Sequence, residues 1–196
     1  MGFKALILIT SGETDRTKIL TETKSRSGPY ALSAINPNSL LFNQLNPSQR
    51  SEALTNNGIF CFSHSFSVGV KNAKNNENFS NFWNISAEAI AATNTDENFR
   101  IVAAVEAKNY PFFATIFHPE KSLFEWRVPA NRSFNSVQAS QKFMNFFINF
   151  CKLNKNRIDP EVLQKKLIKN YPNYLQPPVG HFVQKYYFKE SIIKQT

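Results

Sequence analysis

The residues that decide how this chain folds are 111–121, which read Pro-Phe-Phe-Ala-Thr-Ile-Phe-His-Pro-Glu-Lys. The β-branched and aromatic run at 112–117 predicts a short β-strand. His118 follows this run, and Glu120 lies two residues further on. An imidazole with a nearby carboxylate is typical of a general base and the group that orients it, and open α/β sheets place such chemistry at the carboxyl ends of strands. The stretch therefore predicts a catalytic pair that needs a nucleophile.

The residues before this stretch predict further strands. Ranges 58–70, 85–93 and 101–107 are rich in β-branched and aromatic or small apolar residues, and the polar residues 94–98 form a turn signal. Because no helical pattern separates them, residues 85–117 predict consecutive strands and not alternating βαβ units.

The other segments are expected to be loops or helices. Residues 5–10 are ambiguous between helix and strand, residues 25–50 predict a loop with short pieces of structure, and residues 71–81 predict a polar surface loop. Residues 136–153 show helical periodicity, with an apolar face expected at Val137, Phe143, Met144, Phe147, Phe150 and Cys151.

The C-terminal part predicts one more helix. Asp159 and Pro160 are typical of an N-cap and a first helical residue, so a helix is expected to run to residue 170. The tail after it, rich in Pro and aromatic residues, is expected to pack as an irregular strap over the domain.

Composition narrows the class of protein. A chain of 196 residues with 42% hydrophobic and 19% charged residues is long enough for one domain with a core, and too apolar for global disorder. The net charge is +9, but the basic residues are scattered, which favours a role in solubility over a nucleic-acid-binding patch. No apolar run reaches the roughly 20 residues that span a bilayer, and the run at 5–9 is too short for a signal-peptide core.

Neither of the two candidate nucleophiles, Cys61 and Ser11, fits the required pattern. A nucleophile elbow needs small neighbours, but Cys61 lies between Phe60 and Phe62, and Ser11 lacks the leading Gly. Cys61 and Cys151 both stand beside aromatic residues, so both are expected to be buried, inert thiols.

Other interpretations of the histidines remain open. His118 would serve structure alone if it were hydrogen-bonded at a strand end with Glu120 on the surface. A metal site would need His64 as a third ligand, and three loosely spaced ligands are weak support for one. His64 lies in a β-prone apolar segment, which favours a satisfied, partly buried histidine. Neither a metal nor a cofactor is expected.

Five segments resemble the γ-glutamyl hydrolase family, which belongs to the class I glutamine-amidotransferase-like superfamily. They are Phe-Ser-His-Ser-Phe-Ser-Val at 62–68, Thr-Asn-Thr-Asp at 93–96, Val-Glu-Ala-Lys-Asn-Tyr-Pro at 105–111, Phe-His-Pro-Glu-Lys at 117–121 and Phe-Glu-Trp at 124–126. The resemblance implies an α/β fold, a flavodoxin-like three-layer sandwich of the class I glutamine amidotransferase type, incomplete at the N-terminus. It covers roughly residues 2–149, and the tail only weakly. Residues 1–155 are expected to form the C-terminal part of the hydrolase domain, and residues 156–196 a helix and an aromatic, Pro-rich tail that pack on it.

The resemblance also implies an activity. The family is a cysteine-type omega peptidase that hydrolyses γ-glutamyl bonds in folate polyglutamates with a Cys-His-Glu arrangement. On this pattern His118 is the general base and acid, Glu120 orients it, and His64 binds substrate, although Ser65-Phe66 replaces the Lys-Trp or Lys-Tyr that often follows this histidine. The implied partner is a folate polyglutamate or another γ-glutamyl small molecule, without nucleic acid or membrane, and the family allows a homodimer. The implied location is the vacuole or lysosome, or outside the cell.

The chain departs from the family at its first residues. The family's elbow reads Gly-Thr-Cys-Leu-Gly-Phe, and alignment of Gly2-Phe3 with its last two residues places the thiol immediately before Met1. Residues 2–11 then correspond to the helix after the elbow. The chain by itself is therefore expected to be inactive. The alternative is a non-catalytic relative that acts as a binding or interaction protein.

Overall fold

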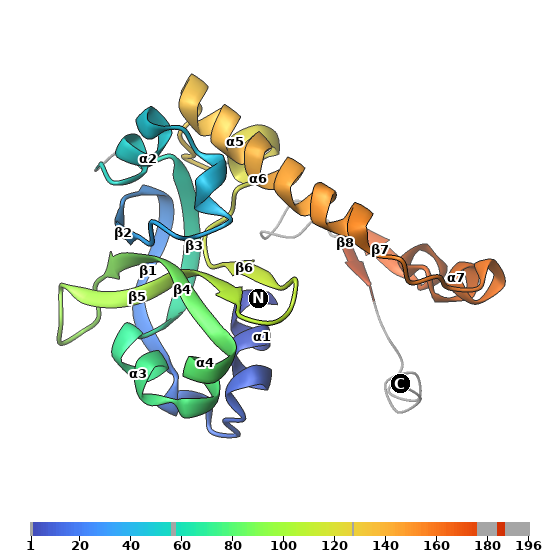
Figure 1. Ribbon diagram of the computed structural model, residues 1–196, viewed down its shortest axis with the longest axis horizontal. Coiled ribbons are helices and arrows are strands. Elements are labelled where there is room, and N and C mark those ends of the chain that lie inside the picture. The colour runs from blue at the N-terminus through green and yellow to red at the C-terminus, as the bar shows by residue number, and fades with distance from the viewer. Residues whose placement is uncertain (1, 56–57, 127, 176–183, 187–196) are drawn as a thin grey trace. The chain divides into compact units, whose positions relative to one another are not determined.

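The computed structural model describes residues 2–55, 58–126, 128–175 and 184–186 (Figure 1). The chain divides into two compact units, Met1–Leu153 and Asn154–Thr196. The fold is mixed α/β with antiparallel sheets.

The larger sheet of the first unit has four antiparallel strands in the order β2-β4-β5-β6 (Figure 1). Their bounds are Leu32–Ile35 (β2), Trp83–Ala91 (β4), Phe99–Ala107 (β5) and Phe113–Thr115 (β6). Strands β4, β5 and β6 pair in chain order, so the prediction of consecutive strands is confirmed. Strand β6 is shorter than the run at 112–117 suggested.

A second, two-stranded sheet pairs β1 (Leu20–Tyr30) with β3 (Phe60–Val68). Strand β3 was predicted, but β1 and β2 lie largely where a loop was expected at 25–50, and that prediction is wrong. Local residue preferences at 25–35 are weak, and the backbone of β1 pairs instead with β3, except around an irregularity between Glu22 and Arg26 where the Lys24 amide donates to the Ala92 carbonyl. The rest of the range holds the 3-10 helix η2 (Phe42–Gln44) and α2 (Pro47–Ala53), which Asn46 caps.

Three helices occupy residues for which the sequence predicted either a helix or a strand, at 5–10, or a surface loop, at 71–81. Helix α1 (Gly2–Ser11) confirms the helical alternative for the first residues. Helices α3 (Val70–Asn75) and α4 (Glu77–Phe82) replace the surface loop expected at 71–81, so that prediction is wrong as well. The Asn76 side chain accepts a hydrogen bond from the Phe79 amide at 2.8 Å, which begins α4 directly where α3 ends.

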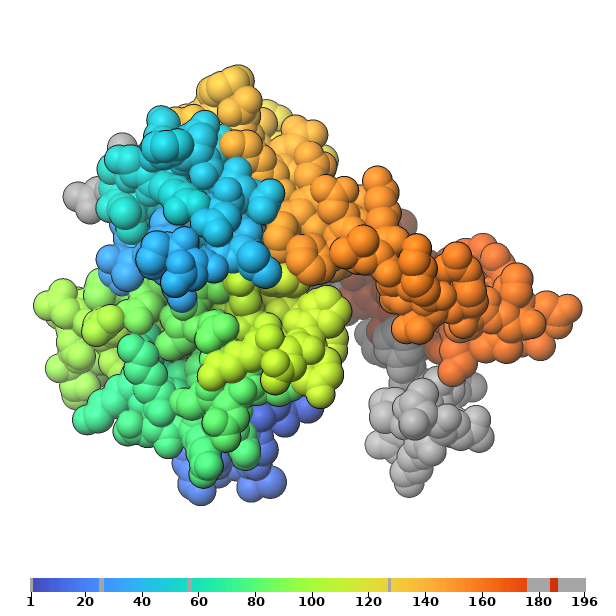
Figure 2. Space-filling view, viewed as in Figure 1, coloured from blue at the N-terminus to red at the C-terminus, as the bar shows by residue number. Residues whose placement is uncertain are grey.

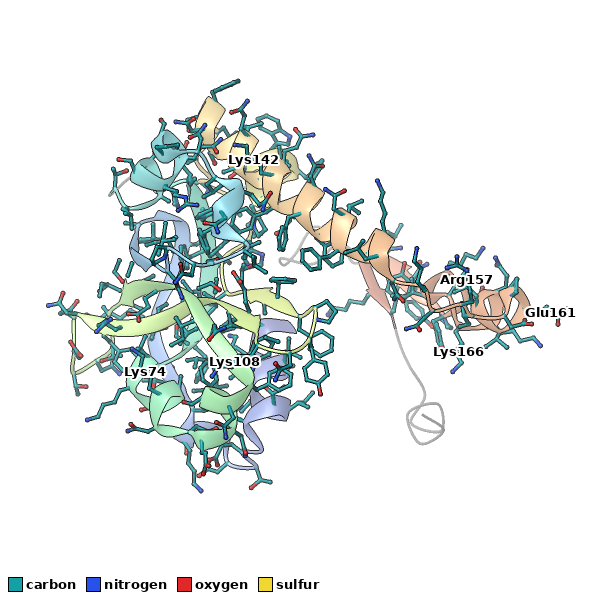
Figure 3. All side chains as sticks on the ribbon, in the orientation of Figure 1. Lys74, Lys108, Lys142, Arg157, Glu161 and Lys166 are labelled. Atoms are coloured by element: carbon teal, nitrogen blue, oxygen red, sulfur yellow. The ribbon has the colours of Figure 1, made fainter. Side chains whose placement is uncertain are left out.

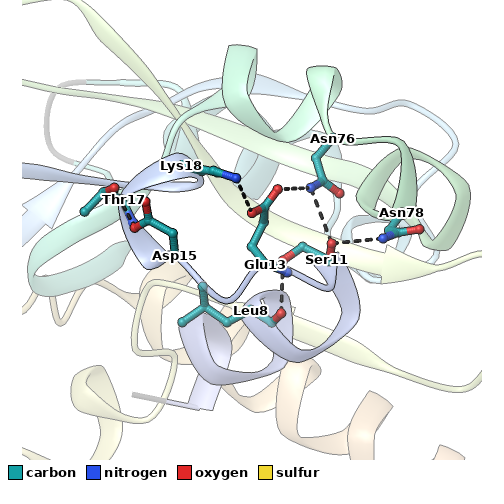
Figure 4. A network of polar contacts seen from close by, with 8 residues as sticks. All are labelled: Leu8, Ser11, Glu13, Asp15, Thr17, Lys18, Asn76 and Asn78. Atoms are coloured by element: carbon teal, nitrogen blue, oxygen red, sulfur yellow. Dashed lines mark hydrogen bonds and ion pairs between the residues drawn. The ribbon is translucent and has the colours of Figure 1, made fainter.

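Polar contacts fix the carboxyl end of α1 against α4 (Figure 4). The Ser11 carbonyl accepts hydrogen bonds from the side chains of Asn76 at 3.4 Å and Asn78 at 3.1 Å. Glu13 accepts a further bond from Asn76 and pairs with Lys18 at 3.6 Å, where the 3-10 helix η1 (Arg16–Lys18) ends. These contacts anchor the carboxyl end of α1 to the first turn of α4.

Helix α6 (Phe134–Leu153) confirms the long amphipathic helix, but its buried face differs from the predicted one. Its buried residues are Ser136, Ala139, Ser140, Phe143 and Phe146, whereas Phe147 and Cys151 are exposed. Small serine and alanine side chains let the helix approach its neighbours closely, and hydropathy alone does not reveal this. Helices α2 and α6 lie side by side (Figures 1 and 2), joined by the hydrogen bond from Lys142 Nζ to Gln49 Oε1 at 2.9 Å.

Aromatic rings fill the centre of the first unit. Phe60 of β3 stacks on Phe117 with ring centroids 4.3 Å apart, and Phe42, Phe62 and Phe143 contact this pair mostly edge to face. Such ring pairs add to the stability that apolar burial provides. The high phenylalanine content thus has a structural use.

The second unit contains α7 (Pro160–Lys166), the 3-10 helix η3 (Ile168–Asn170) and the antiparallel pair β7 (Asn173–Leu175) and β8 (Gln184–Tyr186). Asp159 caps α7 as predicted, accepting a hydrogen bond from the Glu161 amide at 2.8 Å. The tail was expected to be irregular, yet its described residues form a strand pair; residues 176–183 and 187–196 lie outside the described part. How residues 156–196 pack on the domain stays a prediction.

The first prediction concerns the aromatic core. We expect Phe60→Ala to lower the free energy of unfolding by about 3–5 kcal/mol, because a ring that is 1% exposed leaves a cavity among other rings. Denaturant unfolding measures this. Phe147→Ala is the matched control, since that ring is 60% exposed and should cost well under half as much. Equal losses in the two variants would contradict the assignment of the core.

The second prediction concerns the end of α1. Gly12 has a φ of 68°, and a Cβ at this position would lie 2.9 Å from Asn78 Nδ2. We expect Gly12→Ala to destabilise the fold by about 1–2 kcal/mol, the cost of a left-handed conformation for a residue with a Cβ. Gly2→Ala is the control, because a Cβ there meets no atom within 4 Å. A thermal unfolding midpoint in Gly12→Ala no lower than in Gly2→Ala would refute this account.

Candidate active site

A cavity of about 260 Å³ lies where three segments that are distant in sequence meet. The amino end of α1, the middle of β3 and the segment after β6 supply its walls. The lining residues are Gly2, Phe3, Lys4, Ser63, His64, Thr115, Ile116, Phe117, His118, Pro119 and Glu120. All three residues predicted to carry function line this one cavity.

Strand β3 fixes the backbone of His118. The His118 amide donates a hydrogen bond to the Cys61 carbonyl at 2.7 Å, and the two residues form an isolated antiparallel bridge. The preceding ring, Phe117, is buried against Phe60, so the chain enters the site from the core. Pro119 then turns the chain, and helix α5 (Lys121–Phe124) begins after Glu120. His118 thus stands on a rigid support.

His118 and Glu120 form a hydrogen-bonded pair, with Nδ1 and Oε1 2.7 Å apart. An ionised carboxylate only accepts, so this contact favours the tautomer in which Nδ1 carries the proton. Nε2 then keeps its lone pair and is able to take a proton from a neighbouring group. The His118 side chain is 34% exposed, which leaves it accessible to a reactant.

The charge of Glu120 is stabilised by its neighbours. Partial burial raises the pKa of this carboxyl, but the hydrogen bond with His118, a backbone hydrogen bond and the charges of His118 and Lys121 together outweigh that effect. The resulting pKa of Glu120 is below its ordinary value. The carboxylate is therefore ionised at neutral pH, as a group that orients an imidazole and stabilises its protonated form must be.

His64 lies in the same cavity but is more deeply placed. It is 8% exposed, and its Nδ1 lies 3.2 Å from the Ser67 hydroxyl, which in turn contacts Thr23. The Phe62 ring packs against the imidazole at 5.8 Å. The structure brings His64 and His118 to one cavity, as the family resemblance implied, and a role of His64 in substrate binding stays a prediction.

Neither cysteine provides a reactive thiol at this site. Burial is the largest influence on Cys61 and raises the pKa of its thiol, and its Sγ lies 3.7 Å from the Phe62 carbonyl. Cys61 is not among the residues that line the cavity. Cys151 is exposed on α6. The expectation that both thiols are buried is therefore wrong for Cys151, which follows the last buried residue of this helix, Phe146.

Ser11, the other nucleophile considered, is engaged within its own helix. Its hydroxyl donates a hydrogen bond to the Leu8 carbonyl at 3.0 Å within α1.

Lys4 lines the cavity, although it was not among the functional residues predicted from the sequence. It lies in the first turn of α1 and is partly buried, and this burial lowers the pKa of its amine. Gly2-Phe3 resembles the end of the family's elbow, so the next residue, Lys4, could have been expected beside the reactive site.

Other kinds of site receive no support from the described residues. Among them, no group of three potential ligating side chains is placed to hold a metal ion. Of the labelled basic residues, Lys74 belongs to α3, Lys108 follows β5 and Lys142 belongs to α6 (Figure 3), so positive charge is dispersed over separate elements. No helix in the described part of the chain is long and apolar enough to cross a membrane.

Comparison with known proteins identifies relatives along most of the chain. No family model matches. Gamma-glutamyl hydrolase B of Dictyostelium discoideum is 33% identical over 149 residues, which cover 74% of this chain and 42% of that protein. Gamma-glutamyl hydrolase of Mus musculus is 28% identical over 191 residues, or 96% of this chain and 58% of that protein. Probable gamma-glutamyl hydrolase 3 of Arabidopsis thaliana is 26% identical over 179 residues, or 89% and 49%.

The chain thus spans about half the length of the curated relatives it matches. These relatives come from an amoeba, a mammal and a plant, and each is named as a gamma-glutamyl hydrolase. The chain belongs to the γ-glutamyl hydrolase family.

Proposed function

We propose that the cavity around His118 is part of an active site that hydrolyses γ-glutamyl bonds, with folate polyglutamates as the substrate class. The observation that carries this proposal is the 2.7 Å hydrogen bond between His118 and Glu120 in the wall of a cavity. The names of the relatives support the reaction. The mixed α/β fold is compatible with the flavodoxin-like, glutamine-amidotransferase type of domain, which we include in the proposal.

The chemistry follows from the pair. His118 Nε2 takes the proton of a cysteine thiol, and the thiolate attacks the γ-carbonyl carbon of the substrate. The protonated His118, stabilised by Glu120, gives that proton to the leaving amine as the carbon–nitrogen bond breaks. His118 then accepts a proton from the water that attacks the thioester, and returns it to the departing thiolate. His64 is proposed to contact the substrate from the opposite wall segment, β3.

The thiol is proposed to belong to the amino side of α1. Gly2 and Phe3 match the last two residues of the family's elbow, and both line the cavity. The two cysteines within this chain are not placed to act, since one is buried away from the cavity wall and the other is on α6. The vacuolar, lysosomal or extracellular location and a homodimer remain predictions from the resemblance.

A second candidate function is a non-catalytic binding protein. The observation that favours it is that no thiol is among the described residues that line the cavity. Such a protein would keep the cavity and bind γ-glutamyl compounds without cleaving them.

The third prediction separates these two functions. We expect the 196-residue chain by itself to release no glutamate from a γ-glutamyl oligomer, because neither Cys61 nor Cys151 offers a thiolate to His118. Chromatography of the products over time measures this, with His118→Ala as the matched blank. Turnover by the unaltered chain that is lost in His118→Ala would contradict the prediction and make a different group the nucleophile.

The fourth prediction concerns the tautomer of His118. We expect Glu120→Gln to lower the fraction of His118 that carries its proton on Nδ1, because an amide accepts a hydrogen bond more weakly than a carboxylate. Side-chain nitrogen NMR measures the two ring nitrogens, and His118→Ala assigns their signals. Glu77→Gln, an exposed change in α4, is the control. An unchanged ring in Glu120→Gln would mean that Glu120 does not orient His118.

The same variant gives a pH dependence. Because the pKa of Glu120 is lowered in the folded protein, its stabilisation is present above the ordinary glutamate pKa of about 4.3 and is lost as pH falls through the folded-state value. We expect the unfolding midpoints of the unaltered chain and Glu120→Gln to converge as pH falls from 6 to 3. A gap that persists or widens toward pH 3 would argue against an ionised Glu120 as the stabilising form.

A further inference from the structure

Two cations lie beside one aromatic ring next to the cavity. Lys4 lines the cavity itself, and its Nζ is 5.9 Å from the centroid of the Phe66 ring. The guanidinium carbon of Arg16 is 6.0 Å from the same centroid. The ring is 37% exposed, so it holds the two cations near the surface and not within the core. Positive charge is therefore present both on the cavity wall, at Lys4, and beside the neighbouring Phe66 ring, at Arg16.

These two cations lack a carboxylate partner among the described residues. No Asp or Glu oxygen in that part of the chain lies within 4.0 Å of Lys4 Nζ or of the Arg16 guanidinium. Glu120 is the carboxylate of the cavity wall, and it is bonded to His118. Cation–π contact with Phe66 offers each cation only a modest gain.

Lys4 is the less satisfied of the two. Burial without a compensating negative group disfavours its charged form, and the pKa of its amine is lowered for this reason. An anion that binds within the cavity would restore the balance. Charge-assisted hydrogen bonds from an ammonium to a carboxylate are about twice as strong as neutral ones.

We propose that Lys4 and Arg16, which both lie beside the Phe66 ring, form an anion-binding edge: Lys4 is a specificity residue that binds a carboxylate of the substrate in the cavity, and Arg16 adds a second positive charge. The inference rests on the proposed function and deepens it, because it states what the substrate must carry. A γ-linked glutamyl chain has one free α-carboxylate on every residue, whereas an ordinary peptide bond consumes that group. Two cations beside one ring match a ligand whose negative charges repeat along its length.

Binding measurements test the anion-binding edge without any catalytic step. Isothermal titration of the 196-residue chain uses γ-linked triglutamate and the same peptide with all α-carboxylates converted to carboxamides. We expect the carboxylate peptide to bind more tightly. Lys4→Met should weaken its binding about 10-fold or more and leave the carboxamide peptide unchanged. Lys4→Arg should retain most of the preference, and Arg16→Gln should cause a smaller loss than Lys4→Met.

Lys71→Met is the matched control, because it removes one exposed lysine from another helix and does not touch the cavity. Thermal unfolding of Lys4→Met checks that the variant is folded, and Lys4→Arg supplies the same comparison if it is not. The inference is overturned if the unaltered chain binds neither peptide or both equally. It is also overturned if Lys4→Met binds the carboxylate peptide as tightly as Lys71→Met does.

The inference and the proposed function fail in different ways. One outcome is a binding preference for the carboxylate peptide that depends on Lys4, without His118-dependent hydrolysis even when a cysteine precedes α1. This outcome would support the anion-binding edge and reject the proposed hydrolase activity. Hydrolysis that depends on His118, with no loss of binding in Lys4→Met, would reject the edge alone.

Discussion

The backbone hydrogen bond from the His118 amide to the Cys61 carbonyl is the contact on which the site depends. It joins the segment after β6 to β3. The side chains of Phe117 and His118, the two residues at this junction, lie in different surroundings. Phe117 is buried and stacks on Phe60 at 4.3 Å, while the His118 side chain is 34% exposed at the cavity. Packing of the Phe117 ring in the core and the bond from the His118 amide to β3 together fix the place of the imidazole.

The parts of the site that could be predicted from sequence are those whose geometry is local. His118 and Glu120 are two residues apart, and the turn at Pro119 is enough to bring their side chains within hydrogen-bonding distance. Strands β3, β4 and β5 could also be predicted from the sequence, because their apolar runs are long and the polar segment between β4 and β5 is typical of a turn. The convergence of His64 on the same cavity needed the family resemblance, since 54 positions of sequence separate it from His118.

The parts that could not be predicted are set by distant partners. Strand β1 carries Ser, Gly and Pro that favour loops, and it is a strand because β3 pairs with it on both sides of an irregularity between Glu22 and Arg26. Helices α3 and α4 are short and polar, and Asn76, which joins them, serves as a cap that composition does not distinguish from a loop residue. On α6 the helix was predicted correctly, but Ser136 donates a buried hydrogen bond to the Ile59 carbonyl at 2.8 Å, so the buried face includes hydroxyls that a hydropathy pattern excludes.

Glu120 and Lys4 show opposite consequences of the same physical setting. Both line one cavity and both are partly withdrawn from water, which disfavours the charged form of each. Glu120 is compensated by His118, a backbone hydrogen bond and Lys121, so its pKa falls below the ordinary value; Lys4 has burial alone acting on it, and its pKa falls for that reason. The carboxylate is thus prepared before any ligand binds, and the ammonium reaches its most favourable state only with an anion beside it. We therefore expect the cavity to favour ligands that place negative charge near Lys4, beside a Glu120 carboxylate that is already ionised.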